Sequence, residues 1–198
     1  MKYFDTLPKI VGSDNNNNAV ILTNLMARAS IVSDLATNPL LYYTYDIQDG
    51  DTPEIVAHKY YGDSYRYWIV LMANQIMDPQ WEWPMSGSVL SQYLSQKYGS
   101  VDIYSTKHHF EKIITHYDIN TGTSTINIVN ITEDEYNTMV TGLQSYTLPT
   151  GVVEVTTNRR AVTIFDYEME RNENKRQIKL LNKTYVNQFE DDFKKLMK

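Results

Sequence analysis

The stretch from Tyr42 to Trp83 reads YYTYDIQDGDTPEIVAHKYYGDSYRYWIVLMANQIMDPQWEW and carries the clearest local signals of the chain. A β-prone run leads into a turn at Asp49-Gly50-Asp51, and Asp51 or Thr52 then caps a helix with Pro53 in its first turn. Gly62 predicts the end of that helix, because glycine readily adopts the left-handed conformation that closes helices. The pattern therefore predicts a strand, a turn and a short helix.

A second helix is expected from Tyr65 to Asn74, with Ser64 as its cap. Its run Tyr67-Trp68-Ile69-Val70-Leu71-Met72-Ala73 is apolar almost all round. A helix without a polar face has to be covered on several sides, so we expect it to form the core of its unit.

The order of strand, GDT turn and two short helices around YGD, ending in an asparagine, resembles a LysM module. The residues that carry this resemblance are Gly50, Asp51, Thr52, Tyr61, Gly62, Asp63, Trp68, Asn74, Asp78 and Pro79. The closing strand of such a module is not evident after Asn74, where Asp78-Pro79 and Trp81-Glu82-Trp83-Pro84 follow instead.

A wider resemblance covers NPLLYYTYDIQDGDTPEIVAHKYYGD, YWIVLMANQIMDP and YEMERNENKRQIKLL. These segments are similar to the small baseplate wedge protein of T4-like contractile-tailed phages, the gene product fifty-three family. The resemblance implies a non-enzymatic structural component of the virion tail baseplate, assembled in the bacterial cytoplasm and joining neighbouring wedges into a six-fold ring. The implied partners are the core-bundle wedge subunits and the sheath-like small wedge protein.

The alternative function is a LysM-type peptidoglycan-binding protein that acts at the host cell wall. Trp81 and Trp83 beside an Asp-Pro turn could form a sugar-stacking platform, or they could be a packing plug. LysM modules known for glycan binding usually recur in tandem or accompany a hydrolase. Neither arrangement is seen in this sequence, so the structural function is the first hypothesis and glycan binding the second.

The expected fold class is α+β, in four consecutive segments. They are an N-terminal arm and helix (1–40), a LysM-like β-α-α domain with an extra covering helix (41–100), a small antiparallel β-rich region (101–165) and a charged C-terminal helical segment (166–198).

An extended arm is expected for residues 1–18, because Pro8, Gly12 and the asparagines before residue 19 favour turns over helix. The arm either docks on another subunit or packs on its own domain. A helix is expected to follow to about Ala36, with an apolar stripe at helical spacing. The stripe consists of Ile21, Leu22, Leu25, Met26, Ala29 and Val32.

In the middle of the chain, Ser86 or Ser88 is expected to cap a helix that ends near Tyr98, followed by short strands. The expected strands are Val101–Tyr104, Phe110–Tyr117, Thr125–Val129, Gly151–Thr156 and Ala161–Phe165. Asn120-Thr121-Gly122 predicts a hairpin turn, and Thr132 begins a short helix that Gly142 stops.

In the charged tail, a first helix is expected from Asp166 to Lys175, and Gln177 to Leu181 is either a strand or a continuation of that helix. Thr184 then caps an amphipathic helix. The alternating acidic and basic residues of this tail fit either a solvent-exposed face with many ion pairs or a contact surface. The candidate partner contacts are Trp81, Trp83, Arg171, Lys175, Arg176, Lys179, Tyr185, Phe189 and Phe193.

Composition excludes several classes of function. The net charge of −6 has no basic block to neutralise phosphates, so nucleic-acid binding is not expected. The sequence has no Cys and therefore no thiol nucleophile or disulfide, and its apolar runs are too short for a membrane span. His108 and His109 should point to opposite faces of a strand, and His116 lies too far along it, so no metal site is predicted. Asp49 and Asp51 sit in a turn, Glu133 to Glu135 in the first turn of a helix, and Glu190 to Asp192 on a face expected in water, so we expect no catalytic residue and no cofactor.

The sequence has 16 Tyr but only 5 Phe, and this excess has two interpretations. The tyrosines either line the rim of the core or lie on surfaces that become buried on assembly.

Overall fold

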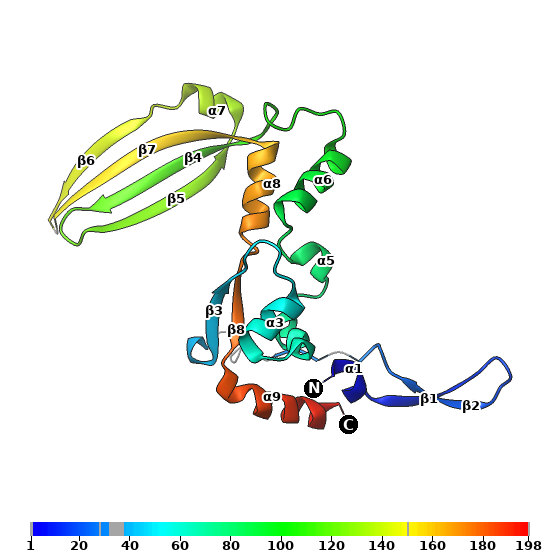
Figure 1. The fold of residues 1–198 in the computed structure, drawn as a ribbon. Helices are drawn as coiled ribbons and strands as arrows, with labels where there is room; N and C mark the ends of the chain where they lie inside the picture. The colour runs from blue at the N-terminus through cyan, green and yellow to red at the C-terminus, as the bar shows by residue number, and fades with distance from the viewer. Residues whose placement is uncertain (1, 28, 32–37, 150, 198) are drawn as a thin grey trace. The chain divides into compact units, whose positions relative to one another are not determined.

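The computed structural model describes residues 2–27, 29–31, 38–149 and 151–197, and it confirms the α+β class, with helices and small antiparallel sheets (Figure 1). The chain forms two compact units: unit 1 comprises residues 1–90 and 172–198, and unit 2 comprises residues 91–171. The boundaries between the units fall inside helices α6 (Gly87–Tyr98) and α8 (Ile164–Glu173). Among the described helices, none has both the length and the apolar character needed to cross a membrane.

The N-terminal part of unit 1 is a β-hairpin, so the expected helix from residue 19 is wrong. A short helix α1 (Tyr3–Thr6) precedes strands β1 (Lys9–Ser13) and β2 (Ala19–Thr23), which pair antiparallel. The Asp14 side chain accepts hydrogen bonds from the backbone of Asn16 and Asn18, each at 2.8 Å, and this turn folds the chain back on itself. The part of the expected stripe at Val32 lies outside the described residues.

The central stretch of unit 1 forms a strand and two helices, as the sequence predicts, and a distant strand closes it. The elements are the 3-10 turn η1 (Pro39–Leu41), β3 (Tyr42–Asp46), α3 (Pro53–Tyr61), the 3-10 turn η2 (Ser64–Arg66) and α4 (Tyr67–Ala73). Strand β8 (Gln177–Leu181) pairs antiparallel with β3, with Tyr42 opposite Leu181 (Figure 1). Residues 177–181 are therefore a strand, not an extension of the preceding helix.

Helix α4 lies between two apolar clusters, which confirms that it is the core of its unit. Trp68 and Ile69 belong to one cluster, together with Val186 and Phe193 of helix α9 (Lys183–Leu196). Val70 belongs to the other cluster. The remaining buried members of that second cluster are Ile47, Val56, Ala57, Trp83, Ile178 and Leu180.

After Asn74, at the place of the closing strand of a LysM module, the chain forms helix α5 (Pro79–Glu82) and then α6. The helix expected to end near Tyr98 is therefore present as α6. The strand that pairs with β3 is β8, from the C-terminal part of the chain.

Unit 2 contains a four-stranded antiparallel sheet in the order β5-β4-β7-β6 (Figure 1). Its elements are β4 (Lys107–Asp118), β5 (Thr123–Ile131), α7 (Glu133–Thr138), β6 (Gly142–Leu148) and β7 (Gly151–Thr163). The hairpin turn before β5 is confirmed, with Gly122 at φ +66°.

Three of the strand predictions for unit 2 need correction. Residues 101–104 form turns rather than a strand. The two strands expected between residues 151 and 165 form the single long strand β7, and Phe165 lies in α8. Strand β6 begins at Gly142, where only the end of a helix was expected, because the short polar helix α7 stops four residues earlier at Thr138.

Candidate functional site

The residues that resemble a LysM signature hold unit 1 together, beginning with the contact between Asn74 and β8. Asn74 Nδ2 donates to the carbonyl oxygens of Val70 and Lys179, both at 2.8 Å, and Asn74 Oδ1 accepts from the Lys179 backbone N–H at 2.7 Å. The amide side chain therefore pairs with β8 much as a neighbouring strand would. Lys179, a candidate partner contact, is exposed and is held here through its backbone.

The turn before α3 uses its two cap candidates for different purposes. Thr52 is the N-cap, since its side chain accepts from the Ile55 N–H at 3.4 Å, and Gly50 has φ +85°. Asp51 is buried, and its carboxylate accepts from the Tyr45 hydroxyl at 2.8 Å and from Lys59 Nζ at 2.6 Å. Burial alone would raise the pKa of Asp51, but the hydrogen bonds from Lys59 and Tyr45 outweigh it and lower that pKa below its usual value.

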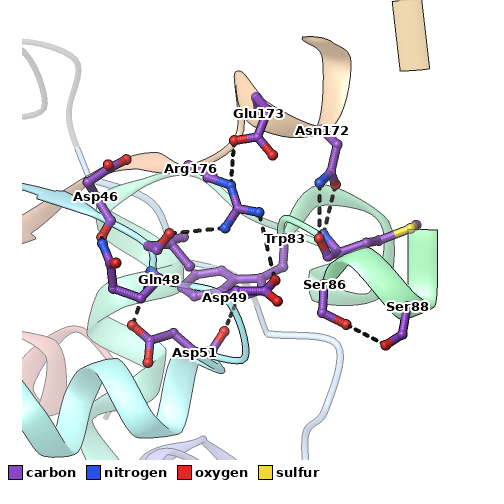
Figure 2. Close-up of polar contacts among 12 residues, drawn as sticks. Asp46, Gln48, Asp49, Asp51, Trp83, Ser86, Ser88, Asn172, Glu173 and Arg176 are labelled. Carbon is purple, nitrogen blue, oxygen red and sulfur yellow. Dashed lines mark hydrogen bonds and ion pairs between the residues drawn. The ribbon is translucent and has the colours of Figure 1, made fainter. Parts of the chain in front are cut away.

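Trp83 is a packing plug on this turn. Its indole Nε1 donates to the Asp51 carbonyl oxygen at 2.7 Å, and its side chain is only 7% exposed (Figure 2). Trp81, by contrast, is 50% exposed, and its carbonyl oxygen accepts from Lys175 Nζ at 2.6 Å. The two indoles therefore do not share one exposed platform, and the ring of Trp83, a candidate partner contact, is buried in the core of unit 1.

Arg176 ties the same turn to the C-terminal segment (Figure 2). Its guanidinium donates to Glu173 at 2.6 Å and to the Ile47 carbonyl oxygen at 3.1 Å, and it lies 3.8 Å from Asp49. The Ile47 N–H in turn donates to the Arg176 carbonyl oxygen at 2.9 Å. Arg176 and Lys175 thus have roles within unit 1, whereas Arg171 is exposed on α8.

Helix α9 is an integral part of unit 1. The ring of Phe193 is buried 4.7 Å from the Trp68 ring, and the half-buried Phe189 lies 5.8 Å from it. Of the candidate partner contacts on this helix, Phe193 is buried, whereas Tyr185 is 40% exposed. The N-cap is Asn182, whose side chain accepts from the Thr184 N–H at 3.1 Å, rather than Thr184 itself.

The other signature residues also have roles in folding. Gly62 closes α3 in the left-handed conformation at φ +74°. Asp63 caps η2, and Asp78 caps α5 with Pro79 in its first turn. The Tyr61 hydroxyl donates to the Leu181 carbonyl oxygen at 3.0 Å, a further tie between α3 and β8.

Sequence reasoning missed a polar cluster in unit 2. His108 and His109 have their Nδ1 atoms 2.9 Å apart, although adjacent strand residues were expected on opposite faces, because the β4–β7 register shifts between Lys107 and His109. His109 contacts the buried carboxylate of Glu111 at 3.1 Å, and Arg160 pairs with Glu111 at 2.8 Å. Within the described part of the chain, no group of three metal-binding side chains could hold an ion.

Two strand surfaces among the described residues carry several exposed apolar side chains each. The first, on unit 1, is the hairpin β1–β2, where Val11 and Ile21 lie opposite each other and are each 78% exposed. The second, on unit 2, is called here the apolar sheet face. It consists of Ile113, Ile126, Ile128 and Leu143, which the strand register places on one side of the sheet.

The other side of that sheet is partly covered. Helix α7 packs there through Tyr136, whose ring lies 4.8 Å from that of Phe110 and receives the Arg159 guanidinium at 4.7 Å. On the apolar sheet face, by contrast, Ile126, Ile128 and Leu143 are 61%, 54% and 60% exposed. Large exposed apolar groups gathered on one side of a sheet mark an interaction surface.

Comparison with known proteins shows the family of this chain. Residues 2–196 match the family described as "Base plate wedge protein 53". The chain is also 28% identical over 154 residues to the baseplate wedge protein gp53 of Enterobacteria phage T4, an alignment that covers 78% of this chain and 72% of the T4 protein. The chain therefore belongs to the base plate wedge protein 53 family and is a structural component of the tail baseplate of a bacteriophage virion.

Proposed function

We propose that this chain joins neighbouring wedges into the baseplate ring through interfaces on both of its units. The observation that carries this proposal is that each unit has its own exposed apolar surface, the hairpin on unit 1 and the apolar sheet face on unit 2. A protein that only caps one partner needs one such surface. Two surfaces on separate units suit a connector, because two modest interfaces on one chain reinforce each other in a closed assembly.

The edges of the sheet in unit 2 support the same role. Soluble proteins usually protect edge strands with charges, prolines or bulges. The outer strands read TSTINIVNI in β5 and GLQSYTL in β6, and neither contains a charged residue or a proline. A partner that covers these edges would prevent them from pairing with the strands of other chains.

In unit 1, we propose that β3, α3, α4 and β8 form a LysM-like module that is kept for its shape. Fold alone does not fix function, so such a module can bind protein. The Asp51 carboxylate and the Trp83 indole N–H are both occupied by contacts within the unit, which argues against their use in glycan binding. By resemblance, the protein partners would be the core-bundle wedge subunits and the sheath-like small wedge protein.

Reconstitution tests the proposal. Wedges purified from an infection that lacks this protein would be mixed with the wild-type chain or with Ile126→Lys/Ile128→Lys, and rings would be counted by negative-stain electron microscopy. Lysines on the apolar sheet face would be buried without partners at an interface. We expect the variant to bind single wedges through unit 1 but to form no rings.

The matched control is Thr125→Lys/Asn127→Lys, which adds the same charge on the opposite side of the same strand. Because α7 already covers part of that side, the control should still form rings. Rings formed in normal yield by the Ile126→Lys/Ile128→Lys variant would show that unit 2 does not join wedges.

A further inference from the structure

The hairpin β1–β2 has an unusual distribution of apolar side chains. Residues paired across the two strands share a face, and successive pairs alternate between faces. Ile10 and Leu22 lie on one face, 47% and 46% exposed, while Val11 and Ile21 lie on the other. The hairpin is therefore apolar on both faces.

The hairpin is also held firmly at its base. The Asn24 N–H donates to the Pro8 carbonyl oxygen at 2.8 Å, and Leu7 beside it is buried in the core of unit 1. The ring of Tyr3 lies 5.7 Å from that of Trp68 and 5.6 Å from that of Phe193. The hairpin is thus an anchored arm rather than a loose terminus.

The tip of the hairpin differs from its shaft. The shaft carries one charged side chain, Lys9, which donates to Thr23 at 2.8 Å at the base. The tip from Asp14 to Asn18 is polar, and its turn is closed by the Asp14 side chain. A polar tip on an apolar shaft suits an arm whose end reaches water while its shaft is covered.

We propose that this hairpin inserts between two apolar, uncharged walls of another baseplate wedge protein, so that both faces of the shaft become buried and the tip stays solvated. An isolated two-stranded ribbon is at best marginally stable in water, so the shaft needs such cover. A flat partner surface would cover one face and leave the other exposed. Five residues per strand span about 17 Å, which sets the depth of the cleft. This inference rests on the proposed function and specifies one of its interfaces.

Two double variants test whether both faces are buried. Val11→Ser/Ile21→Ser and Ile10→Ser/Leu22→Ser each remove the two largest apolar side chains from one face, and Asn15→Ser at the tip is the control. Binding of the full chain to purified wedges would be measured by biolayer interferometry, with the apolar sheet face kept intact. We expect each double variant to lose at least about tenfold in affinity, or about 1.4 kcal/mol, and the tip control to match wild type.

Cross-linking gives an independent readout, because the natural chain has no cysteine. Val11→Cys and Ile10→Cys, each labelled with a benzophenone maleimide, should both cross-link to the same wedge subunit on illumination. Cross-linking from only one of the two positions, or an affinity loss confined to one face, would contradict the two-walled cleft.

Other binding partners of the hairpin would give different results. Binding of wild type to anionic liposomes, lost in both double variants while wedge binding is unchanged, would overturn the inference in favour of a lipid surface. Self-association of wild type in analytical ultracentrifugation, lost in both double variants while wedge binding is unchanged, would overturn the inference in favour of a second copy of this chain. Rings that form normally with both hairpin variants would reject this cleft while leaving the joining role of the apolar sheet face to its own test.

Discussion

In unit 1, β8, α3, α4 and α9 each contribute buried apolar side chains to two clusters, whereas in unit 2 the outer strands β5 and β6 leave their large apolar side chains mostly exposed. Leu180 of β8 is 0% exposed and Leu143 of β6 is 60% exposed, although both are strand leucines. The contrast separates two uses of apolar surface, because burial within the chain stabilises the fold while exposed surface is available for assembly.

The largest effect on stability should come from shortening a buried side chain in unit 1. Leu180→Ala removes a fully buried side chain beside α4, so we expect unit 1 to lose about 2–5 kcal/mol of unfolding free energy. All three tryptophans, Trp68, Trp81 and Trp83, lie in unit 1, so tryptophan fluorescence in a urea titration follows this unit. The matched control Leu143→Ala should leave this transition unchanged, and equal losses in the two variants would erase the contrast between the units.

A smaller loss is expected at the contact that holds β8 against α4. Asn74→Ala removes three hydrogen bonds and leaves backbone groups of Lys179 and Val70 without their partner, which should cost about 2–3 kcal/mol. Hydrogen exchange should show faster exchange at the Lys179 amide than in wild type. Asn74→Asp retains the acceptor for that amide and should recover part of its protection. Unchanged exchange in Asn74→Ala would mean that β3 alone holds the strand.

Local signals in the sequence were sufficient to predict helices α3 and α4 of unit 1. Thr52, Pro53 and Gly62 set the limits of α3, and the apolar run in α4 marked it as core. These signals are reliable because a helix depends on its own caps and on its neighbours within a few residues.

Long-range pairing explains most of what the sequence did not reveal. Lys179 of strand β8 contacts Asn74 from 105 residues further along the chain, and no local pattern links the two segments. The N-terminal hairpin was missed for a different reason. Its run Val20-Ile21-Leu22 fits a strand as well as a helix, and the turn closed by the Asp14 side chain favours the strand.

The candidate site was predicted only in part. The sequence identified Asp51, Trp83 and Arg176 as residues of interest, but not that they contact one turn of unit 1. A register shift in β4 brought His108 beside His109, and bulges of this kind leave no clear mark in a single sequence.

The pH dependence of unit 1 should depend on the Asp51 carboxylate. Its pKa is lowered in the folded state, so it contributes stability above its unfolded pKa of about 3.9, and this is lost as the pH falls through the folded value. We expect Asp51→Asn to be less stable than wild type by about 1–2 kcal/mol at pH 7, with the difference shrinking below about pH 4. Urea titrations followed by tryptophan fluorescence from pH 7 to pH 3 measure this. A difference that stays constant over that range would show that the charge of Asp51 does not contribute.

The smallest effect on stability should be found on the apolar sheet face. Ile126→Thr/Ile128→Thr keeps β-branched side chains in β5, which suit a strand, and replaces the ethyl group of two mostly exposed side chains with a hydroxyl. We therefore expect the unfolding free energy of unit 2, followed by circular dichroism at low concentration, to change by no more than about 0.5 kcal/mol per site. Light scattering at high concentration should fall, because the uncovered apolar area becomes smaller. A loss of several kcal/mol would instead mean that these isoleucines pack within the chain, and the difference between the two units would then be one of degree.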